Sequence, residues 1–215
     1  MLVFIAFTKN TDMQNNMQFM PGYRLNEYQL ILSPHEDLRN RIIDLRKGFN
    51  ETYQPLVAVG GRPQLTLVRF VTWNMLEEKI MQRLKQTAMG FTPFKVELKD
   101  FGSYPSHSIF INITTKLPVQ QLAKEIKGAQ KLMKAHPDYD PHFIQDPNIL
   151  IGRKLAPWQY EKGWLEYSNR HFTGKFIADG MLLLKRPLGG KAYEVVQRMD
   201  FMNLPVATRQ GELFA

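Results

Sequence analysis

Apolar residues recur along the chain with two periods, one typical of helices and one typical of strands. Leu38, Ile42, Leu45 and Phe49 recur at intervals of three or four residues, which predicts a helix with one buried face. Short stretches rich in β-branched and aromatic residues, bounded by Pro or Gly, predict strands. We expect helices over residues 35–53, 75–89, 118–135 and 157–167, and strands over residues 28–33, 64–72, 94–98, 108–113, 148–155, 181–186 and 192–201.

The order of these elements favours an antiparallel α+β fold. No predicted strand carries the long apolar run that is typical of a parallel sheet. A loop over residues 100–107 joins two strands, and Gly189-Gly190 marks the turn of a closing hairpin. We therefore expect α+β rather than a doubly wound sheet. Residues 25–202 are predicted to form one domain, with a tail or added strand over residues 1–24 and a tail over residues 203–215.

Two short segments share a pattern. Residues 63–69 read PQLTLVR and residues 147–153 read PNILIGR. Proline opens both, an amide side chain follows, arginine closes both, and each precedes a predicted helix. Strict alternation along a strand places Gln64 and Thr66 on one face, and Arg69 with the apolar residues on the core side; the same holds for Arg153. Because strands that begin with proline are common, the pattern alone leaves coincidence open.

Gln64-Leu65-Thr66 and Asn148-Ile149-Leu150 each follow a proline, and longer stretches such as YQLILSPHEDL and FKVELKDFGSYPSHSIFINI accompany them. On these residues the chain resembles the two-histidine phosphoesterase superfamily, whose bacterial members include 2′-5′ RNA ligases and cyclic phosphodiesterases. Members carry two His-x-Thr copies that face each other across a cleft. The resemblance spans residues 28–201. It implies a bilobal fold: a pseudo-two-fold repeat of antiparallel sheets, with helices on the outside and a central cleft.

The chain departs from the family at the residues that carry catalysis. The two histidines that act as general acid and base are replaced by Gln64 and Asn148. An amide donates and accepts hydrogen bonds but does not exchange a proton near neutral pH. Each lost acid or base is worth about 10² to 10⁴ in rate. Thr66 remains, whereas Leu150 stands where the second threonine is expected, so the resemblance implies impaired catalysis.

Two histidines are candidate substitutes for the missing pair. His142 lies six residues before Asn148, and His171 opens a literal His-Phe-Thr that lacks the preceding proline. Tyr104, near the central turn, is a candidate to stack on a base. The candidate ligand-binding residues are Gln64, Thr66, Asn148, Arg69, Arg153 and Tyr104.

The net charge of +8 and a pI of about 9.6 favour an anionic partner such as RNA or a nucleotide phosphate ester. Lys124, Lys127, Lys131 and Lys134 form a stripe that either follows a phosphate backbone or is an ordinary solvated helix face. The absence of cysteine excludes disulfides and thiolate metal sites. No His/Asp/Glu cluster has metal-ligand spacing and no apolar run is long enough to span a bilayer. We expect a cytoplasmic monomer without metal, cofactor or membrane contact.

Three functions remain open from the sequence. The first is a binding module that holds RNA ends, nucleotides or phosphate esters in the cleft with its catalysis impaired. The second is an active RNA phosphodiesterase or ligase that uses His142 or His171 in place of the missing histidines. The third is a non-catalytic scaffold for protein interactions. The contents of the predicted cleft decide between them, because fold alone does not determine function.

Overall fold

The computed structural model describes residues 22–134 and 136–204, so most of the predicted N-terminal tail and most of the predicted C-terminal tail lie outside the described residues. Asn203 and Leu204 donate backbone hydrogen bonds to Phe91 and Met89. The strands are β1 (Leu25–Leu32), β2 (Leu65–Trp73), β3 (Phe94–Tyr104), β4 (Ser108–Ile113), β5 (His142–Phe143), β6 (Asn148–Arg153), β7 (Thr173–Ala178), β8 (Gly180–Pro187) and β9 (Glu194–Asp200). The helices are α2 (Glu36–Tyr53), α3 (Glu77–Gly90), α4 (Lys116–Ile126), α5 (Gln130–Met133) and α6 (Pro157–Tyr167), with 3-10 turns η1 (Asn74–Leu76) and η2 (Lys127–Ala129).

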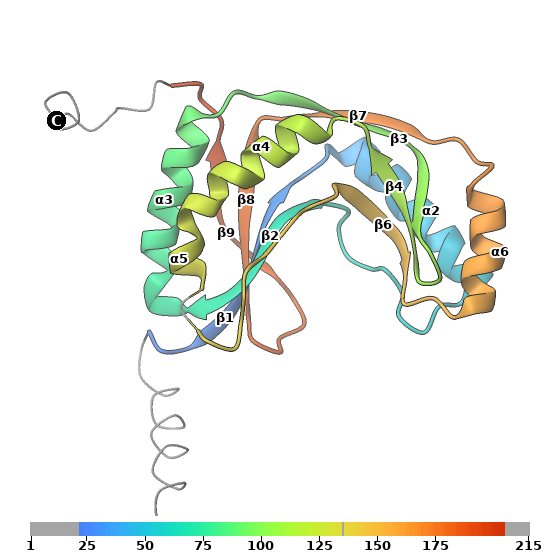
Figure 1. Cartoon of the computed structure of the whole chain (residues 1–215), viewed down its shortest axis with the longest axis horizontal. Coiled ribbons are helices and arrows are strands. Elements are labelled where there is room, and N and C mark those ends of the chain that lie inside the picture. Colours follow the sequence, from blue (N-terminus) through green and yellow to red (C-terminus); the bar gives the residue numbers. More distant parts are fainter. Residues whose placement is uncertain (1–21, 135, 205–215) are drawn as a thin grey trace, which may run out of the picture.

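The strands form two antiparallel sheets, as the sequence predicts. One sheet has the order β5-β2-β1-β8-β9 and the other the order β6-β4-β3-β7. The two sheets are the inner walls of an arch, with α3, α4 and α5 outside the first and α2 and α6 outside the second (Figure 1). The expected bilobal α+β architecture is thereby confirmed.

The two halves of the chain repeat one another. In the first, β1 and its neighbour β2 are joined through α2, which packs against β6 of the other sheet, and α3 follows. In the second, β4 and its neighbour β6 are joined through α4, which packs against β2 of the other sheet, and α6 follows. Each half therefore contributes one helix that packs against the sheet of the other half, and β2 and β6 occupy equivalent positions in the two halves.

The alternation in β1 divides the core from the arch. Tyr28, Leu30 and Leu32 are almost completely buried within the hydrophobic core. Glu27 and Gln29 alternate with them and therefore face the opposite side of the sheet, beneath the arch. The polar side chains that alternate with the apolar residues of β1 thus mark the side of the strand that faces the arch.

Phe49 is the centre of the core in the second lobe. Its ring is fully buried and packs 4.8 Å from the ring of Tyr53 and 5.4 Å from that of Tyr167, measured between centroids. Two glycines let β6 and α6 approach it: a Cβ added at Gly152 would lie 2.6 Å from Phe49 Cε1, and one at Gly163 would lie 3.3 Å from Cε2. This single aromatic ring joins α2, α6 and β6.

The predicted loop over residues 100–107 is wrong in its first half. Strand β3 continues to Tyr104, and the turn is confined to residues 105–107. The register with β4 shifts between Leu98 and Phe101, with Asp100 in the left-handed region at φ 53°. The predicted helix over residues 118–135 also differs: it begins at Lys116 and is interrupted by η2. A weak helix former, Gly128, lies in that interruption.

Candidate functional site

The two motif copies have the same backbone irregularity. In the pairing of β2 with β1, Leu67 is skipped; in the pairing of β6 with β4, Ile151 is skipped. Each is the fifth residue counted from the proline that opens its copy. A β-bulge at the same place in both strands indicates that the sequence repeat is a structural repeat.

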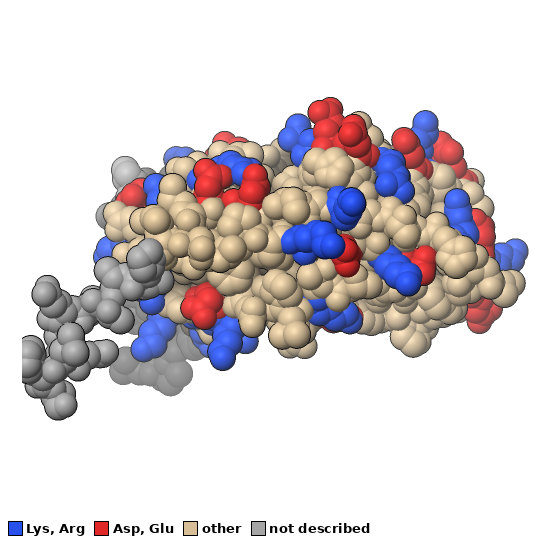
Figure 2. All heavy atoms as spheres, turned by 90° about the horizontal axis from the view of Figure 1, so that it is seen from above, with Lys and Arg blue, Asp and Glu red and all other residues tan. Residues whose placement is uncertain are grey.

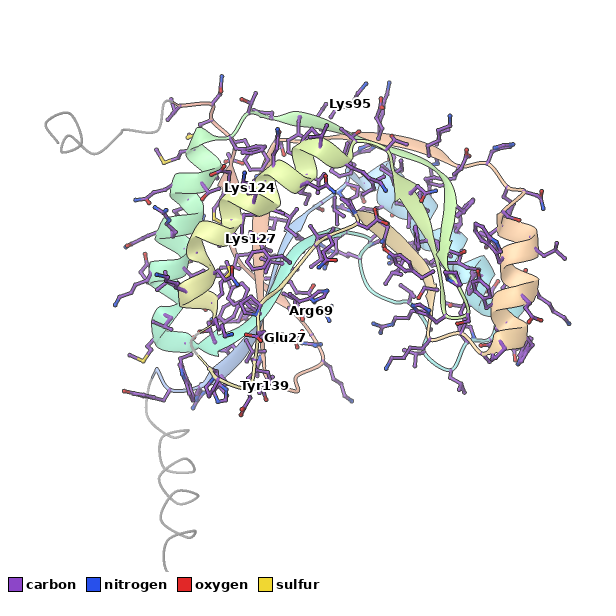
Figure 3. The ribbon with its side chains drawn as sticks, viewed as in Figure 1. Glu27, Arg69, Lys95, Lys124, Lys127 and Tyr139 are labelled. Carbon is purple, nitrogen blue, oxygen red and sulfur yellow. The ribbon has the colours of Figure 1, made fainter. Side chains whose placement is uncertain are left out.

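The bulges reverse the expected direction of the two arginines. One extra residue shifts the alternation, so a side chain beyond the bulge changes face. Arg69 pairs across the sheet with Gln29, on the arch side of β1, and its side chain is 54% exposed. Arg153 pairs with Ser108 and is also exposed. The prediction that both arginines lie on the core side is therefore wrong, and Figure 3 shows Arg69 extending from β2 beneath the arch.

On the first wall, which is the sheet that contains β2, Gln64 is hydrogen-bonded to a second glutamine, Gln29. The amides of Gln64 and Gln29 lie 2.8 Å apart, and the other end of the Gln29 amide lies 2.7 Å from the Tyr193 hydroxyl oxygen. That same end lies 3.2 Å from Arg69 Nε. With its NH₂ there, Gln29 donates to Tyr193 and accepts from Gln64. With its oxygen there, Gln29 accepts from Arg69 and turns its NH₂ to Gln64, whose amide must then turn as well to present its oxygen.

Glu27 is the acidic member of this wall. It accepts from Arg186 Nε at 2.9 Å and from the Tyr193 hydroxyl at 2.6 Å, and Arg69 Nε lies 3.5 Å away. Burial acts to raise the pKa of Glu27, but the hydrogen bonds from Tyr193 and Arg186 and the charges of Arg186 and Arg69 outweigh it and lower the pKa. Glu27 is therefore ionised at neutral pH, and two guanidinium groups face one carboxylate.

The second wall holds Asn148 in a separate network. Asn148 Nδ2 donates to the Tyr104 hydroxyl and to the Asp146 carbonyl, both at 3.0 Å. The Tyr104 hydroxyl donates in turn to Asp146 Oδ2 at 3.2 Å, and Lys116 Nζ lies 2.7 Å from Asp146 Oδ1. The Tyr104 ring packs against that of Phe110. Tyr104 thus lies beside Asn148 on one wall.

The structure separates the two candidate histidines. His142 pairs with Arg69 across β5 and β2, and it is exposed, so it shares the face of Arg69. His171 precedes β7, at the opposite edge of its sheet from β6, and its side chain is 90% exposed. It contacts Asp100, with His171 Nδ1 3.3 Å from Asp100 Oδ1. Of the two, only His142 lies on a wall of the arch.

Among the described residues, the hydrogen bonds of Gln64 stay within the first wall and those of Asn148 within the second. Both side chains are partly buried among polar partners rather than enclosed in an apolar interior. Thr66 and Leu150 each lie two residues further along the same face of the strand, before the bulge. The walls are therefore lined by both motif copies, each with an amide, an exposed arginine and a tyrosine nearby.

Basic side chains elsewhere are not gathered in the same way. Lys124 and Lys127 lie on the helix layer outside the first sheet (Figure 3), and Lys134 pairs with Asp140 at 2.6 Å. On the convex face of the arch, basic and acidic side chains are intermixed (Figure 2). Within residues 22–134 and 136–204, no three His, Cys, Asp or Glu side chains form a metal-binding group, and no helix is long and apolar enough to cross a membrane.

Sequence reasoning missed Glu27, Gln29, Arg186 and Tyr193 on the first wall, and Lys116 and Asp146 on the second. The signal for the first two was present, because they alternate in the sequence with the apolar residues Tyr28 and Leu30. Arg186 and Tyr193 follow them by more than 150 residues, and their roles depend on the pairing of β1 with β8. No local pattern reports such a contact.

Comparison with known proteins agrees with this architecture. A family model described as the 2′-5′ RNA ligase superfamily matches residues 34–190 of this chain. The crystal structure of Escherichia coli LigT in apo form is 16% identical, with a TM-score of 0.58, over 82% of this chain and 98% of LigT. A Thermus thermophilus protein is 16% identical, with a TM-score of 0.57, over 82% of this chain and 98% of its own. No curated protein matches the sequence. The chain is a member of the 2′-5′ RNA ligase superfamily.

Proposed function

We propose that this chain binds the phosphate esters of RNA ends or nucleotides beneath the arch, without the acid–base turnover that two histidines provide. The observation that carries the proposal is the shared geometry of the two motif copies. Each presents an amide directly after the opening proline, where the resemblance implies a histidine, and, through its bulge, an arginine on the same face. The site keeps groups that recognise a phosphate and lacks the groups that transfer protons.

The chemistry of the walls supports an anionic ligand. Guanidinium groups form charge-assisted hydrogen bonds with phosphate oxygens, and amide NH₂ groups add neutral ones. Arg69 is half exposed, so its charge is open to a ligand even though Glu27 lies nearby. Crystal structures of Escherichia coli LigT contain 3′-AMP, phosphate or ATP. We infer the same class of ligand here.

Impaired catalysis follows from the protonation states of the lining residues. Glu27 has a lowered pKa and holds no proton to give to a leaving oxygen at neutral pH. Burial and the charge of Asp146 raise the pKa of Tyr104, so its hydroxyl stays protonated at neutral pH and gives up its proton less readily than an ordinary tyrosine. Gln64 and Asn148 do not titrate. These four residues would therefore hold a bound phosphodiester in place without supplying the proton transfers that cleave it.

A short RNA ending in a 2′,3′-cyclic phosphate tests the proposal by fluorescence titration at about 50 mM and about 200 mM salt. We expect saturable binding that weakens at the higher salt concentration. Arg69→Gln should weaken binding by about tenfold or more, because it removes one charge-assisted contact. Lys85→Gln on α3 removes the same charge from the outer helix layer and should leave the affinity unchanged. Absence of saturable binding at low salt, or equal losses in both variants, would contradict the proposal.

A second candidate function is favoured by one observation, the position of His142 opposite Arg69. There, His142 would serve as the single general base of a slow RNA phosphodiesterase. The assay is hydrolysis of 2′,3′-cyclic AMP by the natural chain and by the His142→Gln and His171→Gln variants. Hydrolysis that is lost only in His142→Gln supports this candidate. Hydrolysis that survives both substitutions removes both histidines from the mechanism.

A further inference from the structure

One buried arginine donates hydrogen bonds both to the backbone of one motif strand and to the backbone just before the other. Arg46, on α2, is 7% exposed. Its Nε donates to the Leu150 carbonyl at 2.9 Å and its Nη1 donates to the Gly61 carbonyl at 3.3 Å. Leu150 lies inside the second motif copy, and Gly61 comes two residues before the proline that opens the first. The same guanidinium therefore joins a strand of one sheet to the connection that leads into a strand of the other.

Both carbonyls lie where strand pairing does not reach. Strand β6 is the edge of its sheet, so the side of Leu150 turned away from β4 has no strand partner. Gly61 lies in the connection between α2 and β2, with φ +75°, a conformation that favours glycine. A guanidinium suits such a place because its donors form a rigid fork that reaches two acceptors at once.

The contacts of Arg46 are not those of an ion pair. Among the described residues, no carboxylate lies within ion-pair distance of its guanidinium, whereas two backbone carbonyls do. Burial lowers the pKa of Arg46 to about 10, so the group is still charged at neutral pH. A buried cation that is satisfied by carbonyls from β6 and from the connection to β2 joins those segments rather than neutralising a nearby charge.

A second buried side chain fastens the other end of the same connection. Gln159, on α6, is 4% exposed and donates from Nε2 to the carbonyls of Tyr53 and Gln54, at 2.9 Å and 3.1 Å. The connection from α2 to β2 is thus tied at both ends to the lobe that contains β6 and α6. Strand β2 itself belongs to the other lobe. Through this connection, the position of β2 depends on the position of the lobe that contains β6.

We propose that Arg46 is a positioning residue that sets the separation and relative orientation of the two motif strands, and with them the distance between Gln64 and Asn148 across the arch. The statement about strand positions stands on the contacts of Arg46 alone. Its consequence for ligand binding rests on the proposed function. The experiment below separates these two parts.

The lack of native cysteine allows two spin labels to be placed without background. Lys85→Cys on α3 and Glu161→Cys on α6 are exposed and lie on the outer helices of opposite lobes (Figure 1). Pulsed electron–electron double resonance should give one narrow distribution of distances between the two spin labels in the protein with Arg46 intact. Arg46→Met keeps an apolar stem but loses both hydrogen bonds, and should shift or broaden that distribution. Arg46→Lys cannot reach both carbonyls with a rigid fork, and should give an intermediate result.

The affinity of the same proteins for 3′-AMP gives the second measurement. Arg46→Met should bind about tenfold more weakly or worse, because a small displacement of one wall removes contacts made from both. An unchanged distance distribution in folded Arg46→Met overturns the proposal, whatever the fall in melting temperature. If Arg46→Met does not fold, an unchanged distribution in Arg46→Lys overturns it. If the intact protein does not bind 3′-AMP, the proposed function fails, while the distances still decide the role of Arg46.

Discussion

The triple variant Gln64→His, Asn148→His, Leu150→Thr should hydrolyse 2′,3′-cyclic AMP about 10² to 10⁴ times faster than the natural chain. The substitutions introduce a general acid and a general base at Gln64 and Asn148, where the strands already present polar side chains, and a threonine hydroxyl at Leu150, on the same face as Asn148. Gln29, which contacts Gln64, is placed to orient a histidine ring introduced there. Steady-state hydrolysis, followed by separation of the nucleotide products, measures the gain.

Variants with one restored histidine serve as controls. Gln64→His or Asn148→His alone should gain much less than the triple variant, because the acid and the base act on opposite sides of the reacting phosphorus. Adding Arg69→Gln to the triple variant should reduce the rate again. A triple variant that is folded, binds nucleotide and shows no gain would mean that β2 and β6 do not present these positions to one ligand.

Phe49→Ala should lower the free energy of unfolding by about 3 to 5 kcal/mol, a large fraction of the stability of a domain of this size. The ring is fully buried between Tyr53 and Tyr167, and its neighbours Gly152 and Gly163 have no side chains that could move into the cavity. Urea unfolding followed by tryptophan fluorescence measures the loss.

Two substitutions calibrate this loss. Phe49→Leu retains part of the buried volume and should cost clearly less than the alanine variant. Leu165→Ala, on the exposed face of α6, should change the unfolding free energy by no more than about 0.5 kcal/mol, because that side chain is 73% exposed. A Phe49→Ala loss as small as that of Leu165→Ala would show that Phe49 does not hold α2, α6 and β6 together.

The elements predicted from the sequence were those with a strong local period. The helix over residues 35–53 agrees closely with α2, because apolar residues recur at helical spacing along most of its 18 residues. The loop over residues 100–107 was wrong since Asp100 and Gly102 are typical turn residues, yet here Asp100 forms a bulge. Gly102 is needed because a Cβ there would lie 2.5 Å from Asn112 Oδ1. Neither reason is visible without the neighbouring strand.

The candidate site was predicted in its residue types and only partly in its geometry. Gln64 and Asn148 were identified from the repeat and the resemblance, and the structure places each in a polar network on one wall. The direction of Arg69 was wrong because strict alternation ignores a bulge, which depends on the register between two strands. The partners of Glu27 were missed because they come from the far end of the chain.

The shared bulge has a consequence for which changes the two motif strands tolerate. The extra residue of each bulge redirects the arginine by adding one backbone unit, not through its own side chain. That residue can therefore be any of several apolar types, as Leu67 and Ile151 illustrate. The spacing from proline to arginine is not interchangeable: both copies hold five intervening residues, and one more or one fewer would send the guanidinium back towards the helices. What the two copies share is therefore the spacing between proline and arginine rather than the identity of the residues between them. A search for further members should score that spacing.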